Sequence, residues 1–195
     1  GVESTTGIVY GGVSVGGSGL YTAIDPGQHT LTGKIAATTD KDLAIASVTT
    51  TIADGKYYSY YMSGFYNTTT KASDAFVVED PLSDPTDFGF ASVRFVHAIS
   101  NANPMTLYAK NTAAGGTEVA IGTETTYKGA SAFTNVPMGV YDLSTRYAGT
   151  ATNAIARTGV SFIGGRSYTV SARGDITIVS TTATNRPFLD NTANR

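Results

Sequence analysis

Residues of the kinds that usually carry out chemistry are scarce in this chain. It contains two histidines, His29 and His97, and no cysteine. Neither histidine lies in a His-x-His or His-Glu-x-x-His pattern, so the spacing typical of metal ligands is missing. No serine occupies a Gly-x-Ser-x-Gly elbow between a strand and a helix. We therefore predict no enzyme, no cofactor and no metal, and we expect His97 to anchor a turn through a hydrogen bond.

Acidic side chains gather in one stretch, which contains Asp74, Glu79, Asp80, Asp84 and Asp87. Carboxylates that converge on one point could bind calcium. However, the sequence has no Asp-x-Asp-x-Asp loop, and two prolines between positions 81 and 87 favour an extended, solvated segment. The sequence therefore predicts a linker here in preference to a calcium site.

Two short motifs have both a functional and a conformational interpretation. Arg173-Gly-Asp175 is the tripeptide of integrin ligands, and it follows a predicted strand, where adhesive loops lie. Gly-Asp is also a common hairpin turn, and we favour that interpretation. Gly16-Gly-Ser-Gly19 is glycine-rich like a phosphate loop, but neither a Lys-Ser/Thr pair nor a helix follows it, which indicates a loop between strands.

The densest aromatic stretch runs from position 57 to position 66. Its alternation predicts a strand with tyrosines on both faces, one face in the core and the other exposed. An exposed row of tyrosines could stack on sugars, pack on a neighbouring subunit or pack on the adjacent domain. The residues predicted to make an interface or glycan contact are Tyr57, Tyr60, Tyr61 and Tyr66.

The composition argues against several classes of partner. Charged residues make up 14% of the chain, well below the roughly 25% of ordinary soluble proteins. The net charge is −2, and the sequence has no basic stripe to neutralise phosphates, so nucleic acid is not an expected partner. The sequence also has neither a polybasic segment for anionic membranes nor an apolar run long enough to span a bilayer.

The pattern of strands and turns predicts an all-β fold. Strand signals recur roughly every 8–14 residues and are closed by turn residues, which is typical of sandwiches and barrels. Tyrosine, valine and a large number of threonines favour pleated, half-buried surfaces. Ser18 to Ile24 and Ile176 to Ser180 are among the predicted strands.

Residues 7–64 and 122–174 repeat one pattern. Ile52-Ala-Asp-Gly-Lys-Tyr-Tyr58 matches Phe162-Ile-Gly-Gly-Arg-Ser-Tyr168, and each copy then reaches a glycine, Gly64 or Gly174. The period of about 110 residues is too long for a solenoid and indicates two copies of one domain. We predict two tandem immunoglobulin-like β-sandwich domains, at residues 1–80 and 90–195, with a linker at 81–89.

The first copy begins too late in this pattern. About 37 residues precede the matched segment in the second copy after position 90, and nine precede it in the first. The first domain is therefore expected to lack about two N-terminal strands. Three explanations are open: upstream residues are absent, another subunit donates the strands, or the chain's own tail supplies them. The predicted donor or edge strand contains Ile8, Tyr10, Val13 and Val15.

Several segments resemble one known family. These are Val93-Arg-Phe-Val-His-Ala98, Met105-Thr-Leu-Tyr108, Val136-Pro-Met-Gly-Val-Tyr141 and Gly165-Arg-Ser-Tyr-Thr-Val170. The chain resembles the bacterial domain-of-unknown-function family 4397. The resemblance implies small β-sandwich domains, often in tandem, on exported and lipid-anchored proteins, and it implies no reaction or ligand.

These observations together lead to an expected function. We expect a non-catalytic structural or adhesive module at the surface of a bacterium or outside it, which before processing is a periplasm-facing lipoprotein of the outer membrane. The expected partner is a second copy, giving a filament, surface layer or other homo-oligomer, or another surface protein. A carbohydrate-binding module that uses the exposed tyrosines is the alternative.

Overall fold

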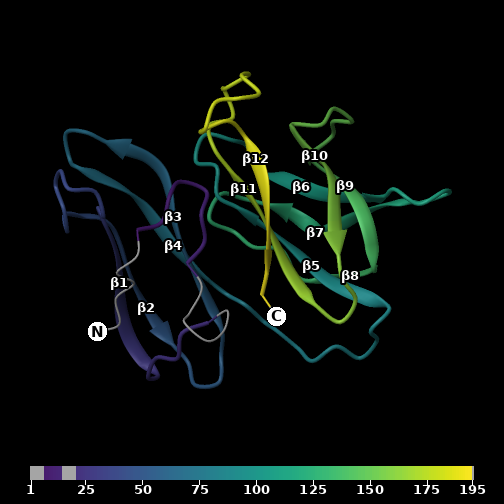
Figure 1. The fold of residues 1–195 in the computed structure, drawn as a ribbon, viewed down its shortest axis with the longest axis horizontal. Helices are drawn as coiled ribbons and strands as arrows, with labels where there is room; N and C mark the ends of the chain where they lie inside the picture. The colour runs from purple at the N-terminus through teal and green to yellow at the C-terminus, as the bar shows by residue number, and fades with distance from the viewer. Residues whose placement is uncertain (1–6, 15–20, 195) are drawn as a thin grey trace. The chain divides into compact units, whose positions relative to one another are not determined.

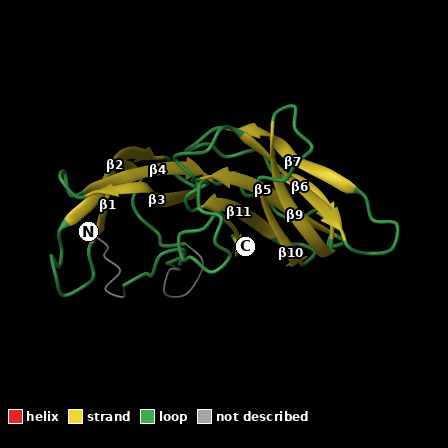
Figure 2. Cartoon of the chain, turned by 90° about the horizontal axis from the view of Figure 1, so that it is seen from above, coloured by secondary structure: helices red, strands yellow, loops and turns green. Residues whose placement is uncertain are grey.

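The computed structural model describes residues 7–14 and 21–194, and every regular element in these ranges is a β-strand. Figure 2 shows the described chain as strands and loops without a helix, so no helix long and apolar enough to cross a membrane occurs there. The predicted all-β class is confirmed. Val15 and the Gly16–Gly19 motif lie outside the described residues.

The chain divides into two compact units, unit 1 at Gly1–Pro81 and unit 2 at Leu82–Arg195. The described part of unit 1 has two antiparallel hairpins, and each is a separate two-stranded sheet. Figure 1 shows these hairpins in purple and blue. Their strands are β1 (Gly27–Lys34), β2 (Ala44–Ile52), β3 (Tyr58–Asn67) and β4 (Ala72–Glu79).

The two hairpins of unit 1 pack closely but bury little. The Met62 thioether of β3 lies directly over Gly33 of β1, in the space that a Cβ at this position would take. The Tyr60 hydroxyl donates to the Ala46 carbonyl at 3.5 Å. The buried hydrophobic residues of the described part of unit 1 are Ala46, Ile52, Phe76 and Val78.

Unit 2 consists of two four-stranded sheets in a sandwich-like arrangement. The strand orders are β10-β9-β6-β7 and β12-β11-β5-β8, and the β5–β11 pair is parallel. The strands are β5 (Phe90–His97), β6 (Met105–Asn111), β7 (Glu118–Thr125), β8 (Thr134–Pro137), β9 (Gly139–Tyr147), β10 (Ile155–Phe162), β11 (Ser167–Arg173) and β12 (Phe188–Ala193).

The main hydrophobic core belongs to unit 2. Leu107 of β6 and Phe95 of β5 are fully buried in it, and Phe162 packs against both Tyr141 and Tyr168 with ring centroids 5.4 and 5.1 Å apart. This core draws inward-facing residues from both sheets, as expected for a sandwich. Unit 2 therefore has the apolar layer that the described part of unit 1 largely lacks.

Unit 2 also buries an arginine. Arg94 of β5 is fully buried, and its Nε donates to the Thr169 hydroxyl at 2.9 Å. That hydroxyl donates in turn to the Asn194 side-chain oxygen at 2.6 Å. The Arg94 guanidinium also lies over the Phe133 ring, 5.1 Å from its centroid. A buried cation of this kind is tolerated only when hydrogen bonds and ring contacts replace its water.

A second group of arginines fastens the last strand, β12. The guanidiniums of Arg157, Arg173 and Arg186 lie 5.1–5.2 Å from the centre of the Phe188 ring. Arg157 donates to the Leu189 carbonyl at 2.7 Å, and Arg173 forms an ion pair with Asp190. These contacts satisfy the cations within unit 2 and hold β12 beside β11.

The predicted strand at Ile176–Ser180 is wrong, because these residues form a turn and an irregular loop. Asp175 accepts hydrogen bonds from the Thr177 N–H at 3.0 Å and the Thr177 hydroxyl at 2.6 Å. This local bonding bends the backbone before a ladder can form. The apolar alternation was misleading, since Val179 is 96% exposed.

The sequence predicts a linker at residues 81–89, and residues 82–89 of this segment fall within unit 2. Asp87 accepts a hydrogen bond from the Gly89 N–H at 2.7 Å, and the Phe90 carbonyl accepts one from the Gly165 N–H at 2.8 Å. Gly164 lets the chain approach closely, because a Cβ there would overlap the Phe88 carbonyl. The segment thus packs against the turn between β10 and β11.

We predict that Gly164→Ala destabilises unit 2 by about 1–3 kcal/mol, the usual cost of forcing extra atoms into a packed site. Urea unfolding followed by circular dichroism measures the change. Ile163→Ala is the neighbouring control, because Ile163 is 57% exposed and surface changes usually stay within about 0.5 kcal/mol. Equal stability of the two variants would contradict the close contact with Phe88.

Candidate functional site

The two hairpins of unit 1 have counterparts among the hairpins of unit 2. Hairpin β1–β2 begins with Gly27 opposite Ile52, and hairpin β9–β10 begins with Gly139 opposite Phe162. Glycine stands at the start of the first strand in both, and each hairpin ends on a buried apolar residue. The two hairpins share the first pairs of their register, and they differ further along, where β9–β10 has an irregularity between Arg157 and Val160.

A tyrosine fixes the corner that follows each of these hairpins. The Tyr58 hydroxyl accepts from the Ala53 N–H at 3.3 Å, and the Tyr168 hydroxyl accepts from the Ile163 N–H at 3.1 Å. Each bond reaches back five residues, to the turn before its own strand. Similar tyrosine corners occur in immunoglobulin-like sandwiches.

The third shared feature is a small polar cluster between β3 and β4, repeated between β11 and β12. The Ser59 hydroxyl donates to the Asp80 carboxylate at 2.7 Å, as the Thr169 hydroxyl does to Asn194. The Asp80 N–H donates to the Tyr57 carbonyl at 2.7 Å, and the Asn194 N–H makes the equivalent bond at 2.8 Å. Asp80 and Asn194 are both buried.

The surroundings of these hairpins differ between the units. In unit 2, β9 pairs with β6 and β11 pairs with β5. Within residues 7–14 and 21–81 no further strand is present, so β1 and β3 each pair on one side only. Counterparts of β5, β6, β7 and β8 are thus missing from this range. We take the unpaired sides of β1 and β3 as the candidate functional site and call them the open edges.

The pairing of β3 with β4 determines which backbone groups of β3 lie on its open edge. The Tyr57 carbonyl accepts a hydrogen bond from the Asp80 N–H, and bonded pairs alternate along an antiparallel ladder. The continuous register from Tyr58 to Ser63 therefore turns the backbone N–H and C=O groups of Tyr58, Tyr60 and Met62 away from β4. The corresponding backbone groups of β11 in unit 2 face β5, as the bond from the Ala98 N–H to the Ala172 carbonyl shows.

Apolar side chains are unusually exposed near this edge. Met62 is 46% and Phe65 is 56% exposed, although both belong to β3. Exposed apolar side chains on an unpaired strand are a feature that soluble proteins usually avoid or use for binding. The edge therefore has the properties of a surface that binds another strand.

The four predicted tyrosines do not form one platform. Tyr57 is 43% and Tyr66 is 44% exposed, and Tyr57 packs against Tyr21 with ring centroids 5.1 Å apart. Tyr61 stacks on Phe76 at 4.9 Å. Tyr60 lies on the opposite face of β3, where burial raises its pKa above the ordinary value. Tyr57 and Tyr61 are thus the pair that shares one face.

The predicted donor residues lie outside any strand. Ile8, Tyr10 and Val13 are 52%, 59% and 57% exposed, and the Gly12 N–H closes a turn on the Val9 carbonyl at 2.8 Å. In this chain they therefore do not fill the missing strand positions of unit 1.

The two histidines have structural contacts. The His97 Nδ1 accepts from the Ile99 N–H at 3.2 Å, and its Nε2 donates to the Asn103 carbonyl at 3.1 Å. This geometry anchors the turn after β5, as expected from the sequence, and burial lowers the pKa of His97. The His29 Nε2 donates to the Asp25 carbonyl at 2.7 Å.

The remaining charged motifs also have partners within their own unit. Among the described residues no three His, Cys, Asp or Glu side chains gather as a metal site would require. Glu79 pairs with Lys56 at 3.1 Å. In the Arg-Gly-Asp tripeptide, Arg173 binds Asp190 and the Asp175 carboxylate accepts from the Asn101 amide at 2.8 Å. Both charged ends of the tripeptide are therefore engaged.

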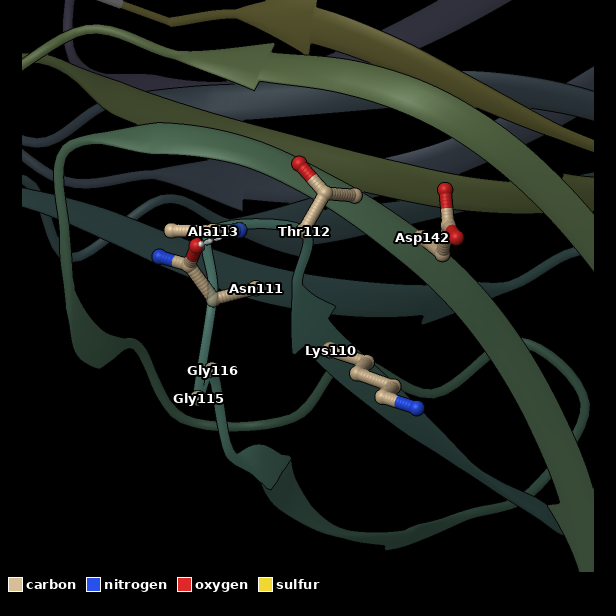
Figure 3. Close-up of a pocket in the computed structure, with 7 residues that line it drawn as sticks. All are labelled: Lys110, Asn111, Thr112, Ala113, Gly115, Gly116 and Asp142. Carbon is tan, nitrogen blue, oxygen red and sulfur yellow. Dashed lines mark hydrogen bonds between the residues drawn. The ribbon is translucent and has the colours of Figure 1, made fainter.

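Unit 2 has an open hollow of about 420 Å³ beside the β6–β7 loop. Figure 3 shows Lys110 and Asp142 on neighbouring strands along it, and Asn111 bonded to the Ala113 N–H at 2.8 Å. Asp142 accepts from the Gly159 N–H at 3.1 Å. The full lining is Lys110, Asn111, Thr112, Ala113, Gly115, Gly116 and Asp142. This wall is polar and contains no histidine or other ordinary proton-transfer group near neutral pH.

The fold of unit 2 is that of a two-sheet β-sandwich module. A family model described as "Domain of unknown function (DUF4397)" matches residues 91–195. This range is more than half of the chain, and the chain therefore belongs to that family. The match lies in unit 2 and does not extend to unit 1, so it does not support a tandem arrangement. No curated protein matches the chain.

We predict that His97 makes unit 2 less stable as the pH falls. Because the folded state holds the His97 pKa below its ordinary value, the unfolded chain binds more protons just below about pH 6.5. The stability from neutral His97 is complete above that pH and is lost as the pH falls toward the folded pKa. Urea unfolding of wild type and His97→Asn at pH 7, 6 and 5 measures this effect.

His97→Asn should lose about 1–3 kcal/mol at pH 7 and show a flatter pH dependence than wild type. His29→Asn is the control, since the His29 hydrogen bond is exposed to solvent, and it should keep the wild-type slope. A slope in His97→Asn equal to that of wild type would contradict the assignment.

Proposed function

We propose that this chain is a non-catalytic structural or adhesive module that assembles through unit 1. In this proposal unit 1 is a partial copy of the family module, and strands of a neighbouring molecule complete it. Because one patch is then filled by a different patch, the contact is heterologous and builds an open chain of subunits. The product is a filament, a surface layer or another homo-oligomer.

The observation that carries the proposal is the contrast between equivalent strands. β11 has partners on both sides, whereas β3, with the same register and the same corner tyrosine, has a partner on one side among the described residues. A two-stranded hairpin is marginal alone, and three or more strands with an apolar face are needed for independent stability. Strand addition would satisfy the edge and cover Met62 and Phe65 together.

The composition supports an exported location for this assembly. A chain with 14% charged residues and no cysteine has the polar, uncharged surface often seen in bacterial secreted β proteins, and it needs no disulfide chemistry. We propose that the protein acts at or outside the bacterial cell surface. In this proposal it is, before processing, a lipoprotein of the outer membrane that faces the periplasm.

We predict that Met62→Pro prevents assembly. The Met62 N–H faces the open edge, so proline removes no bond to β4, but its ring blocks an added strand. Light scattering coupled to size exclusion, with electron microscopy, should show oligomers or filaments of wild type and monomers of the variant.

Met62→Thr is the matched control for this prediction. It also removes the contact with Gly33, but it keeps the N–H and favours a strand. It should assemble like wild type. A monodisperse wild-type monomer at all concentrations tested would overturn the proposal, as would normal assembly of Met62→Pro.

Glycan binding is the second candidate, and the exposure of Tyr57 favours it. Aromatic rings at a surface can stack on sugar rings while the hydroxyl stays in water. If this candidate is correct, a glycan array probed with the labelled chain gives a signal that Tyr57→Ala loses and Tyr57→Phe keeps. Absence of any signal above background would eliminate it.

A further inference from the structure

Three large apolar side chains gather at one end of unit 2. Phe88 is 73%, Met138 is 61% and Ile163 is 57% exposed. They lie on the segment that enters β5, on the β8–β9 turn and on the β10–β11 turn, which Figure 1 shows at the same end of the two sheets. A Cβ on Gly164 would lie 3.4 Å from the Met138 sulfur and would overlap the Phe88 carbonyl, so the three connections are in close contact. We call Phe88, Met138 and Ile163 the apolar tip.

The fold does not require large apolar side chains at these positions. The N–H that bonds to the corner tyrosine belongs to Ile163 in unit 2 and to Ala53 in unit 1. The residue before the first glycine of the hairpin is Met138 in unit 2 and Pro26 in unit 1. Because unit 1 forms the corresponding hairpin with a small residue and a proline, the exposed bulk in unit 2 points to binding.

This end of unit 2 is also free of charge. Four connections there contain no charged residue, namely residues 88–90, 112–117, 137–140 and 163–165. The β6–β7 loop belongs to this end, because the Thr112 N–H donates to the Val140 carbonyl at 2.9 Å. Asp87 and Arg166, one of each sign, stand directly beside the tip segments. An apolar tip whose rim has no net charge matches a neutral bilayer, with its apolar interior and zwitterionic headgroups.

The backbone of the tip is suited to a lipid surface. The Met138 N–H donates to the Gly89 carbonyl at 2.8 Å. The Gly165 N–H donates to the Phe90 carbonyl at the same distance, and the corner tyrosine accepts from the Ile163 N–H at 3.1 Å. Lipid offers no hydrogen bonds, so the backbone groups that enter it must be satisfied within the protein. These three N–H groups meet that condition.

The size of the tip favours a lipid partner over a protein partner. At roughly 150–250 Å² for a fully exposed large side chain, the exposed parts of the three side chains amount to about 400 Å². A stable protein interface takes about 800 Å² from each partner, which is more than the tip offers. Insertion into a bilayer has no such lower limit, because its strength scales with the apolar area that is buried.

We propose that the apolar tip of unit 2 inserts into the surface of a neutral lipid bilayer. Phe88, Met138 and Ile163 lie below the headgroups, and Asp87 and Arg166 lie among them. The contact is peripheral and reversible, because a few side chains enter the bilayer and no element spans it. The inference goes beyond the proposed assembly through unit 1 and does not rest on it.

Flotation of the full-length chain with phosphatidylcholine vesicles in a density gradient tests the proposal. Protein filaments without lipid stay at the bottom of the gradient, so assembly does not imitate binding. Wild type should float with the vesicles equally at low and high salt, because salt screens charges and does not weaken apolar burial. The double variant Phe88→Ser/Ile163→Ser should bind about tenfold or more weakly, as expected when large apolar side chains are withdrawn from lipid.

Val179→Ser is the matched control for the double variant. Val179 is 96% exposed and lies in the loop after the opposite end of β11. The control should float like wild type. Circular dichroism checks that all variants are folded.

A tryptophan at the tip gives a second measurement. The chain contains no tryptophan, so the Phe88→Trp variant has a single reporter at the tip, and Val179→Trp has one at the opposite end. With vesicles, the emission of Phe88→Trp should shift to shorter wavelength, because the indole leaves water for the bilayer interface. The emission of Val179→Trp should not change.

Several results would overturn the inference. These are no flotation of wild type, flotation only with anionic vesicles at low salt, and equal flotation of wild type and the double variant. A double variant that loses self-association, while wild type does not float, identifies the tip as a protein interface and overturns the inference too. Met62→Pro should float like wild type, because the tip belongs to unit 2, so failure of assembly and failure of lipid binding are observed separately.

Discussion

A β-strand has two hydrogen-bonding sides, and the structure of this protein depends on how those sides are filled. Unit 2 fills both sides of β9 and β11, with β10 and β6 beside the first and β12 and β5 beside the second. The described part of unit 1 fills one side of each equivalent strand. Burial follows from this difference, because strands that lack neighbours cannot form the wide sheets that enclose a core.

The repeated local sequence explains why the hairpins of unit 1 still keep the shape of the larger module. Glycine at the start of β1, the corner hydroxyl of Tyr58 and the bond from Ser59 to Asp80 are all local or between adjacent strands. Such interactions form without the rest of a sandwich. The missing ones, to the counterparts of β5 and β6, connect distant parts of the chain and carry the apolar core with them.

The sequence predicted those parts of the fold that short-range patterns encode. The all-β class, the paired hairpins and the turn at His97 follow from alternation, glycine spacing and a histidine at a strand end. The loop at Ile176–Ser180 was missed, because side-chain bonds from Asp175 compete with strand pairing and leave no trace in apolar alternation. The clustering of Ser59, Asp80 and Tyr21 was missed too, since it needs the strand register, which sequence spacing alone does not give.

Burial of charge explains why the polar cluster is a strong selector of strands. A buried arginine costs several kcal/mol unless its hydrogen bonds are replaced, so β5 fits beside β11 only in the register that places Arg94 against Thr169. A shift of one residue would turn the cation toward the core and Val93 or Phe95 out of it. Apolar burial supplies the stability of the pairing, while the buried charge determines its register.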